Sequence, residues 1–167
     1  MSIVEFIKKK PKAELHLHIE GTLEPEHMFV LAKRNNIKIP FDNISEVKKA
    51  YNFSNLESFL KIYYEGSKVL VKEQDFFDLT WAYVLKCKED NVVHTEVFFD
   101  PQTHVYRGIS FDTVISGIYR ALKKANKEFG LSFKIIMCFL RHLDQESGLK
   151  ILNQALAHKD KIFGVGL

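Results

Sequence analysis

Two histidines near the amino terminus have the spacing of paired metal ligands. They lie in the segment KAELHLHIEGTLE, where His16 and His18 alternate with Leu15, Leu17 and Ile19. Residues two apart on a β-strand share a face and are about 6–7 Å apart along it. Both imidazoles are therefore expected on one face, with the aliphatic side chains on the other. Zinc takes His nitrogen readily, and catalytic zinc sites commonly have three protein ligands and a water.

The spacing alone leaves two interpretations of this pair. The histidines bind a metal, or they are partly exposed strand residues that hydrogen-bond to neighbours. The segment is the first predicted strand of a βα series and continues into Glu20-Gly21-Thr22. Active sites of parallel α/β barrels lie at the carboxyl ends of the strands, where His18 and Glu20 are expected. This position favours the metal.

Polar residues also follow two later predicted strands. The segment Asp100–His104 (DPQTH) follows the strand expected at 92–99, and Arg141-His142 follows the strand expected at 133–140. Each segment either contacts a substrate or orders its loop by hydrogen bonds or ion pairs. A further group, consisting of Phe59, Ile62, Tyr63 and Tyr64, is either an aromatic lid over a planar ligand or ordinary core.

A second histidine motif, His94-Thr95-Glu96, is predicted to be structural. H-x-E belongs to one zinc deaminase signature, but that signature also requires P-C-x-x-C, which this sequence lacks. The two cysteines, Cys87 and Cys138, form no C-x-x-C pair. They are expected to be buried, reduced thiols in a reducing compartment rather than a disulfide.

The elements expected to position these residues alternate between strands and helices. After the first strand, helices are predicted from Pro25 to the turn at Asn35-Asn36, near 44–51, from Ser54-Asn55 onward, and over 73–89. Strands are predicted at 92–99, 133–140 and 162–167, and helices at 110–129 and 145–157. Strands that alternate with helices of this length predict parallel βαβ units.

This order predicts the amino-terminal half of a (β/α)8 barrel, an α/β fold. A complete barrel needs about 200–250 residues or more, whereas this sequence has 167 residues and four predicted strands. The sequence ends inside the last predicted strand, which suggests a truncated barrel domain over residues 1–167. Half a barrel exposes two sheet edges and favours pairing with another chain.

The amino-acid composition excludes few functions, but it bears on whether nucleic acid or a membrane is an expected partner. Lys and Arg (24) exceed Asp and Glu (21) by three, and 46% of the residues are hydrophobic. This small surplus gives no reason to expect nucleic-acid or membrane binding. The basic run at Lys8–Lys12 is expected to be a solvated lead-in to the first strand. Without a signal peptide or a transmembrane-length apolar run, the protein is expected to be cytoplasmic.

Five segments together resemble the adenosine/adenine deaminase family of metal-dependent amidohydrolases. They are PKAELHLHIEGTLEPE (11–26), AYNFSNLESFLKIYY (50–64), DLTWAY (78–83), VFFDPQTH (97–104) and IMCFLRHL (136–143). They occur in order along almost the whole chain. The resemblance implies a zinc-dependent (β/α)8 barrel that hydrolyses the exocyclic amine of a 6-aminopurine. It also implies that His16 and His18 are zinc ligands.

The resemblance also bears on the substrate and on what the chain lacks. Nucleoside-specific members usually carry Asp where this sequence has Glu20, and the longer side chain would intrude on the ribose. Glu20 and FDPQTH resemble the adenine-deaminase branch, so adenine is the expected substrate and adenosine the alternative. The family's third His ligand, catalytic glutamate and general base lie beyond Leu167. The chain alone is therefore expected to be inactive. It is either a fragment or half of a split enzyme that needs a carboxyl-terminal partner. The expected protein partner is that carboxyl-terminal half or a second copy of the chain in a homo-oligomer.

Overall fold

The four strands form one parallel sheet whose spatial order follows the chain order. The computed structural model describes residues 2–167. Its strands are β1 (Lys12–His18), β2 (Val92–Phe99), β3 (Ser132–Cys138) and β4 (Gly164–Gly166), in the order β1-β2-β3-β4. Each neighbouring pair is parallel. A sheet that grows strand by strand in one direction, with helices in between, is the arrangement of a (β/α)8 barrel.

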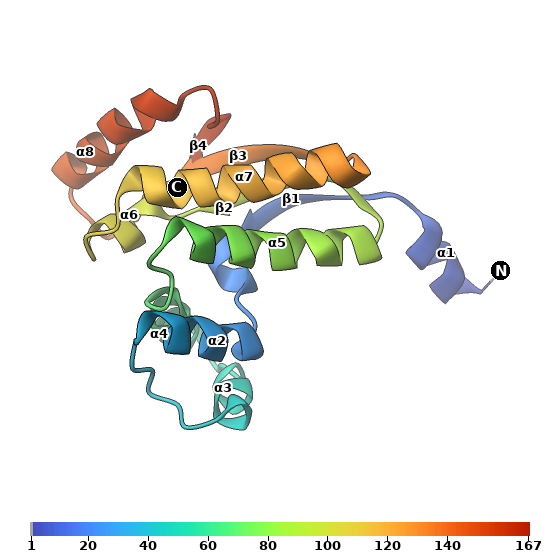
Figure 1. Ribbon diagram of the computed structural model, residues 1–167, viewed down its shortest axis with the longest axis horizontal. Helices are drawn as coiled ribbons and strands as arrows, with labels where there is room; N and C mark the ends of the chain where they lie inside the picture. Colours follow the sequence, from blue (N-terminus) through green and yellow to red (C-terminus); the bar gives the residue numbers. More distant parts are fainter. Residues whose placement is uncertain (1) are drawn as a thin grey trace.

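Helices connect the strands and cover one side of the sheet (Figure 1). The α-helices are α1 (Ile3–Lys9), α2 (Pro25–Asn35), α3 (Ile44–Ala50), α4 (Leu56–Ser67), α5 (Glu73–Glu89), α6 (Pro101–Val105), α7 (Phe111–Phe129) and α8 (Gln145–Ala155). Two 3₁₀ turns, η1 (Ile19–Thr22) and η2 (Leu156–His158), follow β1 and α8. The predicted bounds of α5 and β2 are confirmed, and those of α7 and α8 differ by two residues or fewer. Neither α1 nor α6 was predicted, because seven and five residues are too few to show a helical period.

Local signals explain where the main helices begin and end. Ser110 caps α7, with its Oγ accepting from the Thr113 N–H at 3.1 Å, and Gly130 ends it with φ +75°. Asn55 caps α4 by accepting from the Ser58 N–H. Polar caps and a left-handed glycine stop are the commonest ways to satisfy the free backbone groups at helix ends.

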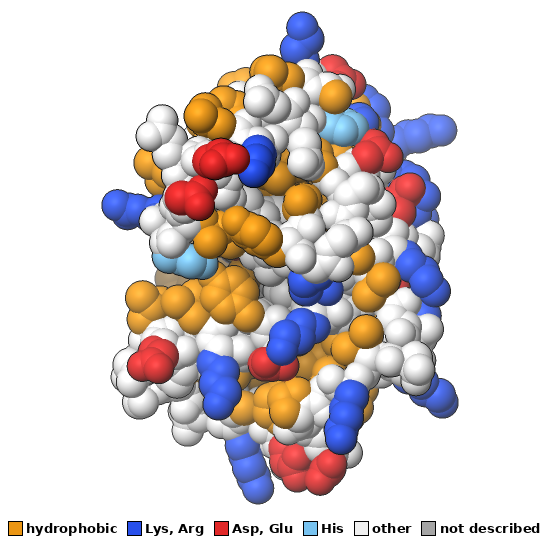
Figure 2. All heavy atoms as spheres, turned by 90° about the vertical axis from the view of Figure 1, so that its left-hand side faces the viewer, with side chains coloured by type: hydrophobic (Ala, Val, Ile, Leu, Met, Phe, Trp, Pro, Cys, Tyr) orange, Lys and Arg blue, Asp and Glu red, His pale blue; other side chains and the backbone are white. Residues whose placement is uncertain are grey.

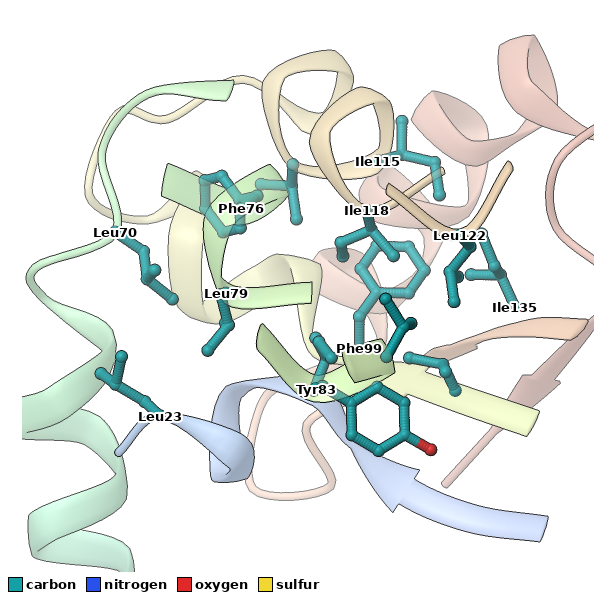
Figure 3. Packing of buried hydrophobic residues seen from close by; sticks show 14 of the residues in the cluster. Leu23, Leu70, Phe76, Leu79, Tyr83, Phe99, Ile115, Ile118, Leu122 and Ile135 are labelled. Carbon is teal, nitrogen blue, oxygen red and sulfur yellow. The ribbon is translucent and has the colours of Figure 1, made fainter. Parts of the chain in front are cut away.

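The core lies between the sheet and helices α5 and α7 (Figure 3). Apolar side chains from both helices, including Phe76, Leu79, Ile118 and Leu122, meet Phe99 and Ile135 of the strands. The two helices approach closely at Gly117, where an added Cβ would lie 2.6 Å from the Phe76 Cβ. This packing fixes β2 and β3, whose carboxyl ends carry the polar residues of interest.

Helices α2, α3 and α4 form a separate lobe after β1 (Figure 1). Arg34 of α2 bonds to Asp75, at the start of α5, and ties the lobe to the barrel helices. The lobe matters for the site because α4 brings Tyr63 to the end of β1. Among residues 2–167, no helix is long and apolar enough to cross a membrane.

The first strand departs from the predicted alternation. Glu14 pairs with Thr95 but Leu17 pairs with Val97, so β1 has one more residue than β2 over this stretch. Such a bulge changes the face to which the following side chains point. As a result Glu14 and Leu17, three residues apart, lie on the same side of the strand: Glu14 reaches Tyr83 of the helix layer and Leu17 packs against the core, whereas Leu15 is 57% exposed. The prediction that Leu15 shares the apolar face is therefore wrong.

Candidate metal and substrate site

The predicted histidine pair lies at the carboxyl half of β1. The rings of His16 and His18 have centroids 5.7 Å apart, and both contact Phe98 on the neighbouring strand. Two imidazoles bound to one tetrahedral zinc ion, with Zn–N bonds of about 2 Å, would have centroids about 5 Å apart. The observed spacing therefore fits two ligands of one ion after a small side-chain adjustment. His16 is exposed and His18 is half-buried.

Asp100, the residue directly after β2, holds the ring of His18. Its Oδ1 lies 3.1 Å from the His18 Nδ1 atom, and its Oδ2 lies 3.3 Å from the same nitrogen. The hydrogen bond to Asp100 raises the pKa of His18 and outweighs the opposite effect of burial. A histidine that donates from Nδ1 to a carboxylate keeps Nε2 free for a metal, and metal-bound histidines usually have such a partner.

Glu20 turns away from open space and into the protein. Its Oε1 accepts from the backbone N–H of Asp100 at 2.9 Å and lies 3.0 Å from the His104 Nε2. The side chains of both Glu20 and His104 are fully buried. The turn η1, in which the Thr22 hydroxyl donates to the Ile19 carbonyl, directs Glu20 inward. Just after the carboxyl end of β1, the Glu20 carboxylate therefore has its hydrogen-bond partners inside the protein, namely the Asp100 N–H and His104.

Tyr63 of α4 closes over the two carboxylates. Its hydroxyl donates to Asp100 Oδ2 at 2.6 Å and lies 3.2 Å from Glu20 Oε2. Burial raises the pKa of Tyr63, and the charges of Glu20 and Asp100 raise it further. The phenol thus stays protonated and acts as a donor. The predicted aromatic group on α4 thus contributes one polar side chain, Tyr63, to the site as well as apolar packing.

Cys138 at the end of β3 completes a second possible set of ligands. One ligand atom each from His18, Asp100 and Cys138 lies within 4.8 Å of the other two. Burial raises the pKa of the Cys138 thiol to about 12. The charges of Asp100 and Glu20 act in the same direction, so the thiol is held in its protonated form beside the two carboxylates. The donor set that fits best is the histidine pair, with Asp100 as its hydrogen-bond partner.

The structure gathers some predicted residues and separates others. His16, His18, Glu20, Asp100 and His104 come together at the carboxyl ends of β1 and β2. The face that contains these strand ends carries apolar side chains and charged side chains of both signs (Figure 2).

The remaining candidates lie apart from this cluster. His94 lies 2.9 Å from the Ser132 hydroxyl and 3.6 Å from Glu96, near the opposite ends of the strands. Arg141 and His142 are exposed. Sequence reasoning missed Arg107, a basic residue three positions after His104 in a segment that carried no recognisable helical signal.

The fold and the paired histidines define a class of protein, an α/β barrel with polar groups at the carboxyl ends of its first strands. A sequence model of the family described as adenosine deaminase matches residues 11–167. This chain belongs to that family.

Relatives and solved structures agree with this assignment. The chain is 61% identical to an adenine deaminase of Psychrobacter cryohalolentis and 60% identical to one of Wolinella succinogenes, covering 99% of this chain and 50% of each relative. The crystal structure of adenine deaminase from Arthrobacter aurescens matches with a TM-score of 0.89 and 45% identity, over 93% of this chain and 47% of that one. The chain thus spans about half the length of the relatives it matches.

A more distant structure supports the fold alone. An amidohydrolase from Burkholderia ambifaria, described with bound Zn, matches with a TM-score of 0.86 and 22% identity, over 99% of this chain and 46% of that one. The four parallel strands are accordingly the amino-terminal half of a (β/α)8 barrel.

Proposed function

We propose that this chain carries the first part of a metal-dependent site that removes the exocyclic amine of a 6-aminopurine, and that adenine is the substrate. The observation that carries the proposal is the His18–Asp100 contact beside His16, at the carboxyl end of the first barrel strand. The relatives that match over the whole chain at about 60% identity are adenine deaminases. The products would be hypoxanthine and ammonia. Such a reaction belongs to purine salvage.

His16 and His18 are the residues that would hold the ion, which we propose to be zinc. Bound there, it would supply a Lewis acid that lowers the pKa of a water molecule. Asp100 orients His18 by accepting the Nδ1 proton, and Tyr63 donates to the other oxygen of Asp100.

We propose that Glu20 restricts the substrate to the free base. Its carboxylate is fully buried and touches Tyr63, so its length helps to set how far Tyr63 and α4 stand from the end of β1. Only a small cavity of about 20 Å³ lies beside Glu20 and Tyr63, so these side chains pack closely against each other. A shorter acid at this position would widen the space. Adenosine is the second candidate substrate, because the matching family model is described as adenosine deaminase.

The groups that donate and accept protons are proposed to come from a segment outside residues 1–167. The family motif that carries them has no counterpart in this sequence. We propose that residues 1–167 form part of a single barrel domain that is completed by a carboxyl-terminal half, on the same polypeptide or on a second one, with a homo-oligomer as the alternative. By this proposal, residues 1–167 alone turn over no purine.

The test compares purine turnover and metal content in the intact protein. We expect kcat/KM for adenine to exceed that for adenosine by about 100-fold or more, because a nucleoside must displace packed protein groups. His16→Ala and His18→Ala should lose both bound zinc and ammonia release, whereas the control His94→Ala, whose ring lies beside Ser132 near the opposite ends of the strands, should retain both. Equal or faster turnover of adenosine would reject the adenine assignment.

A further inference from the structure

Arg107 is held firmly behind the site by backbone carbonyls. Its Nη1 donates to the carbonyl of Lys68 and its Nη2 to that of Leu70, both at 3.0 Å. Its Nε donates to the carbonyl of Thr103 at 3.2 Å. The guanidinium thus ties the end of α4 to the turn of α6 and has a fixed position.

This fixed guanidinium determines which nitrogen of His104 carries the proton. Nη2 of Arg107 lies 2.9 Å from Nδ1 of His104. A guanidinium has only donors, so Nδ1 must accept and the ring proton must be on Nε2. Nε2 lies 3.0 Å from Glu20 Oε1 and therefore donates to it. The imidazole is buried, and the edge-on ring of Phe76, with centroids 4.8 Å apart, keeps it from rotating.

Glu20 connects His104 to Asp100 by hydrogen bonds. The same oxygen that accepts from His104 also accepts from the backbone N–H of Asp100 at 2.9 Å. The side chain of Asp100 then contacts the ring of His18 at 3.1 Å. Hydrogen bonds, joined through the backbone and side chain of Asp100, therefore connect Arg107 to His18 across two separate segments of the chain, 100–107 and 18–20.

We infer that Arg107 and His104 are positioning residues for His18, acting through Glu20 and the backbone of Asp100. The inference rests on the proposed function in one respect, namely that His18 is a metal ligand. Without the donor on His104, Glu20 would lose one of its partners inside the protein. The Asp100 backbone would then be held less firmly, and the carboxylate that orients His18 would move with it.

Variants of His104 separate this role from plain support of the fold. His104→Phe keeps the ring volume and removes both polar contacts. His104→Gln places an amide donor near the former Nε2 and should restore the bond to Glu20. The matched control is Gln102→Leu on the same helix. Gln102 is also buried, but it bonds to the Leu140 N–H and the Ser147 hydroxyl rather than to Glu20.

The first measurement is zinc affinity of the intact protein in competition with a chelator. We expect His104→Phe and Arg107→Met to weaken zinc binding by about 10–100-fold, the usual effect of losing a group that orients a metal ligand. His104→Gln should recover most of the affinity. Gln102→Leu should lower Tm without changing affinity. If affinity falls as much in Gln102→Leu as in His104→Phe, the positioning role is refuted.

The second measurement needs neither zinc nor turnover. Nitrogen-15 NMR of the histidine rings should show His104 as the Nε2–H tautomer, with His18 protonated on Nδ1. In Arg107→Met and in His104→Phe, the Nδ1–H signal of His18 should broaden or shift. If the wild-type protein binds no zinc, the proposed function fails, and these signals still decide the inference. A proton on Nδ1 of His104, or an unchanged His18 signal in both variants, would overturn it.

Discussion

The Nδ1 atom of His18 lies 3.1 Å from Oδ1 of Asp100, and this contact joins the carboxyl ends of two neighbouring strands. The two residues are 82 positions apart in the chain. Parallel pairing sets His18 beside Phe98, so Asp100 emerges just beyond the end of the ladder. The first prediction concerns this pair.

Asp100→Ala should weaken zinc binding by about 10–100-fold, because His18 loses the group that orients its ring. Asp100→Asn keeps an acceptor for the Nδ1 proton and should have a smaller effect. Equilibrium dialysis with zinc measures both. Asp144→Ala is the control, since Asp144 caps α8 by accepting from the Ser147 N–H and has no contact with His18. Equal affinity in Asp100→Ala and wild type would contradict the role of Asp100.

Tyr63→Phe should destabilise the protein by about 1–3 kcal/mol. The substitution removes the only proton donor that α4 offers to the Oδ2 atom of Asp100, leaving a buried carboxylate oxygen with one donor fewer. Thermal unfolding followed by circular dichroism measures the change. Tyr64→Phe is a matched control on the same helix, for which a change within about 0.5 kcal/mol is expected. A similar loss in the two variants would argue against a special role for Tyr63.

Gly117→Ala should destabilise the packing of α7 against α5. The added Cβ would lie 2.4 Å from the Glu73 carbonyl oxygen and 2.6 Å from the Phe76 Cβ, so the helices must separate. Overpacking of this kind costs about 1–3 kcal/mol. Denaturant unfolding measures it.

Gly148→Ala provides the matched control for Gly117→Ala. It is also a helical glycine, but its nearest contact would be an ordinary 3.9 Å to Phe139. Replacing glycine by alanine inside a helix gains about 0.5–1 kcal/mol when space allows. Opposite signs for the two substitutions are therefore expected, and a stabilised Gly117→Ala variant would contradict the observed packing.

Asp75 should make stability depend on pH in the acid range. Burial by itself would raise the pKa of Asp75, but the backbone N–H groups of Lys72 and Val71 lower it, helped by Asn35 and Arg34. A folded-state pKa below the usual 3.8 gives stability that is present above that value and lost as pH falls through the folded pKa.

Asp75→Asn should therefore cost stability at pH 7, by about 1–3 kcal/mol, and should flatten the loss of stability below pH 4. Unfolding measured between pH 7 and pH 2 tests both effects. Asp112→Asn, at an exposed carboxylate, is the control. A parallel pH dependence of wild type and Asp75→Asn would exclude Asp75 as the source.

Local patterns in the sequence determined most of the framework. The apolar period of 73–89, the serine cap of Ser110 and the stop at Gly130 define α5 and α7, because a helix records its buried face and its ends in nearby residues. The β-branched and aromatic run at 92–99 does the same for β2. Alternation of these elements was enough to predict a parallel half-barrel, and H-x-H predicted a candidate metal site at the carboxyl end of its first strand.

Tertiary structure decided what surrounds those two histidines. The bulge in β1 that exposes Leu15 depends on register with β2, which no local pattern records. Likewise, Glu20, His104 and Arg107 show no shared motif, yet the strand ends bring them into hydrogen-bond contact. Periodicity along the chain reports only which side of an element is buried. Which buried polar groups meet depends on strand register and loop geometry, and these are set by the packing of the whole sheet.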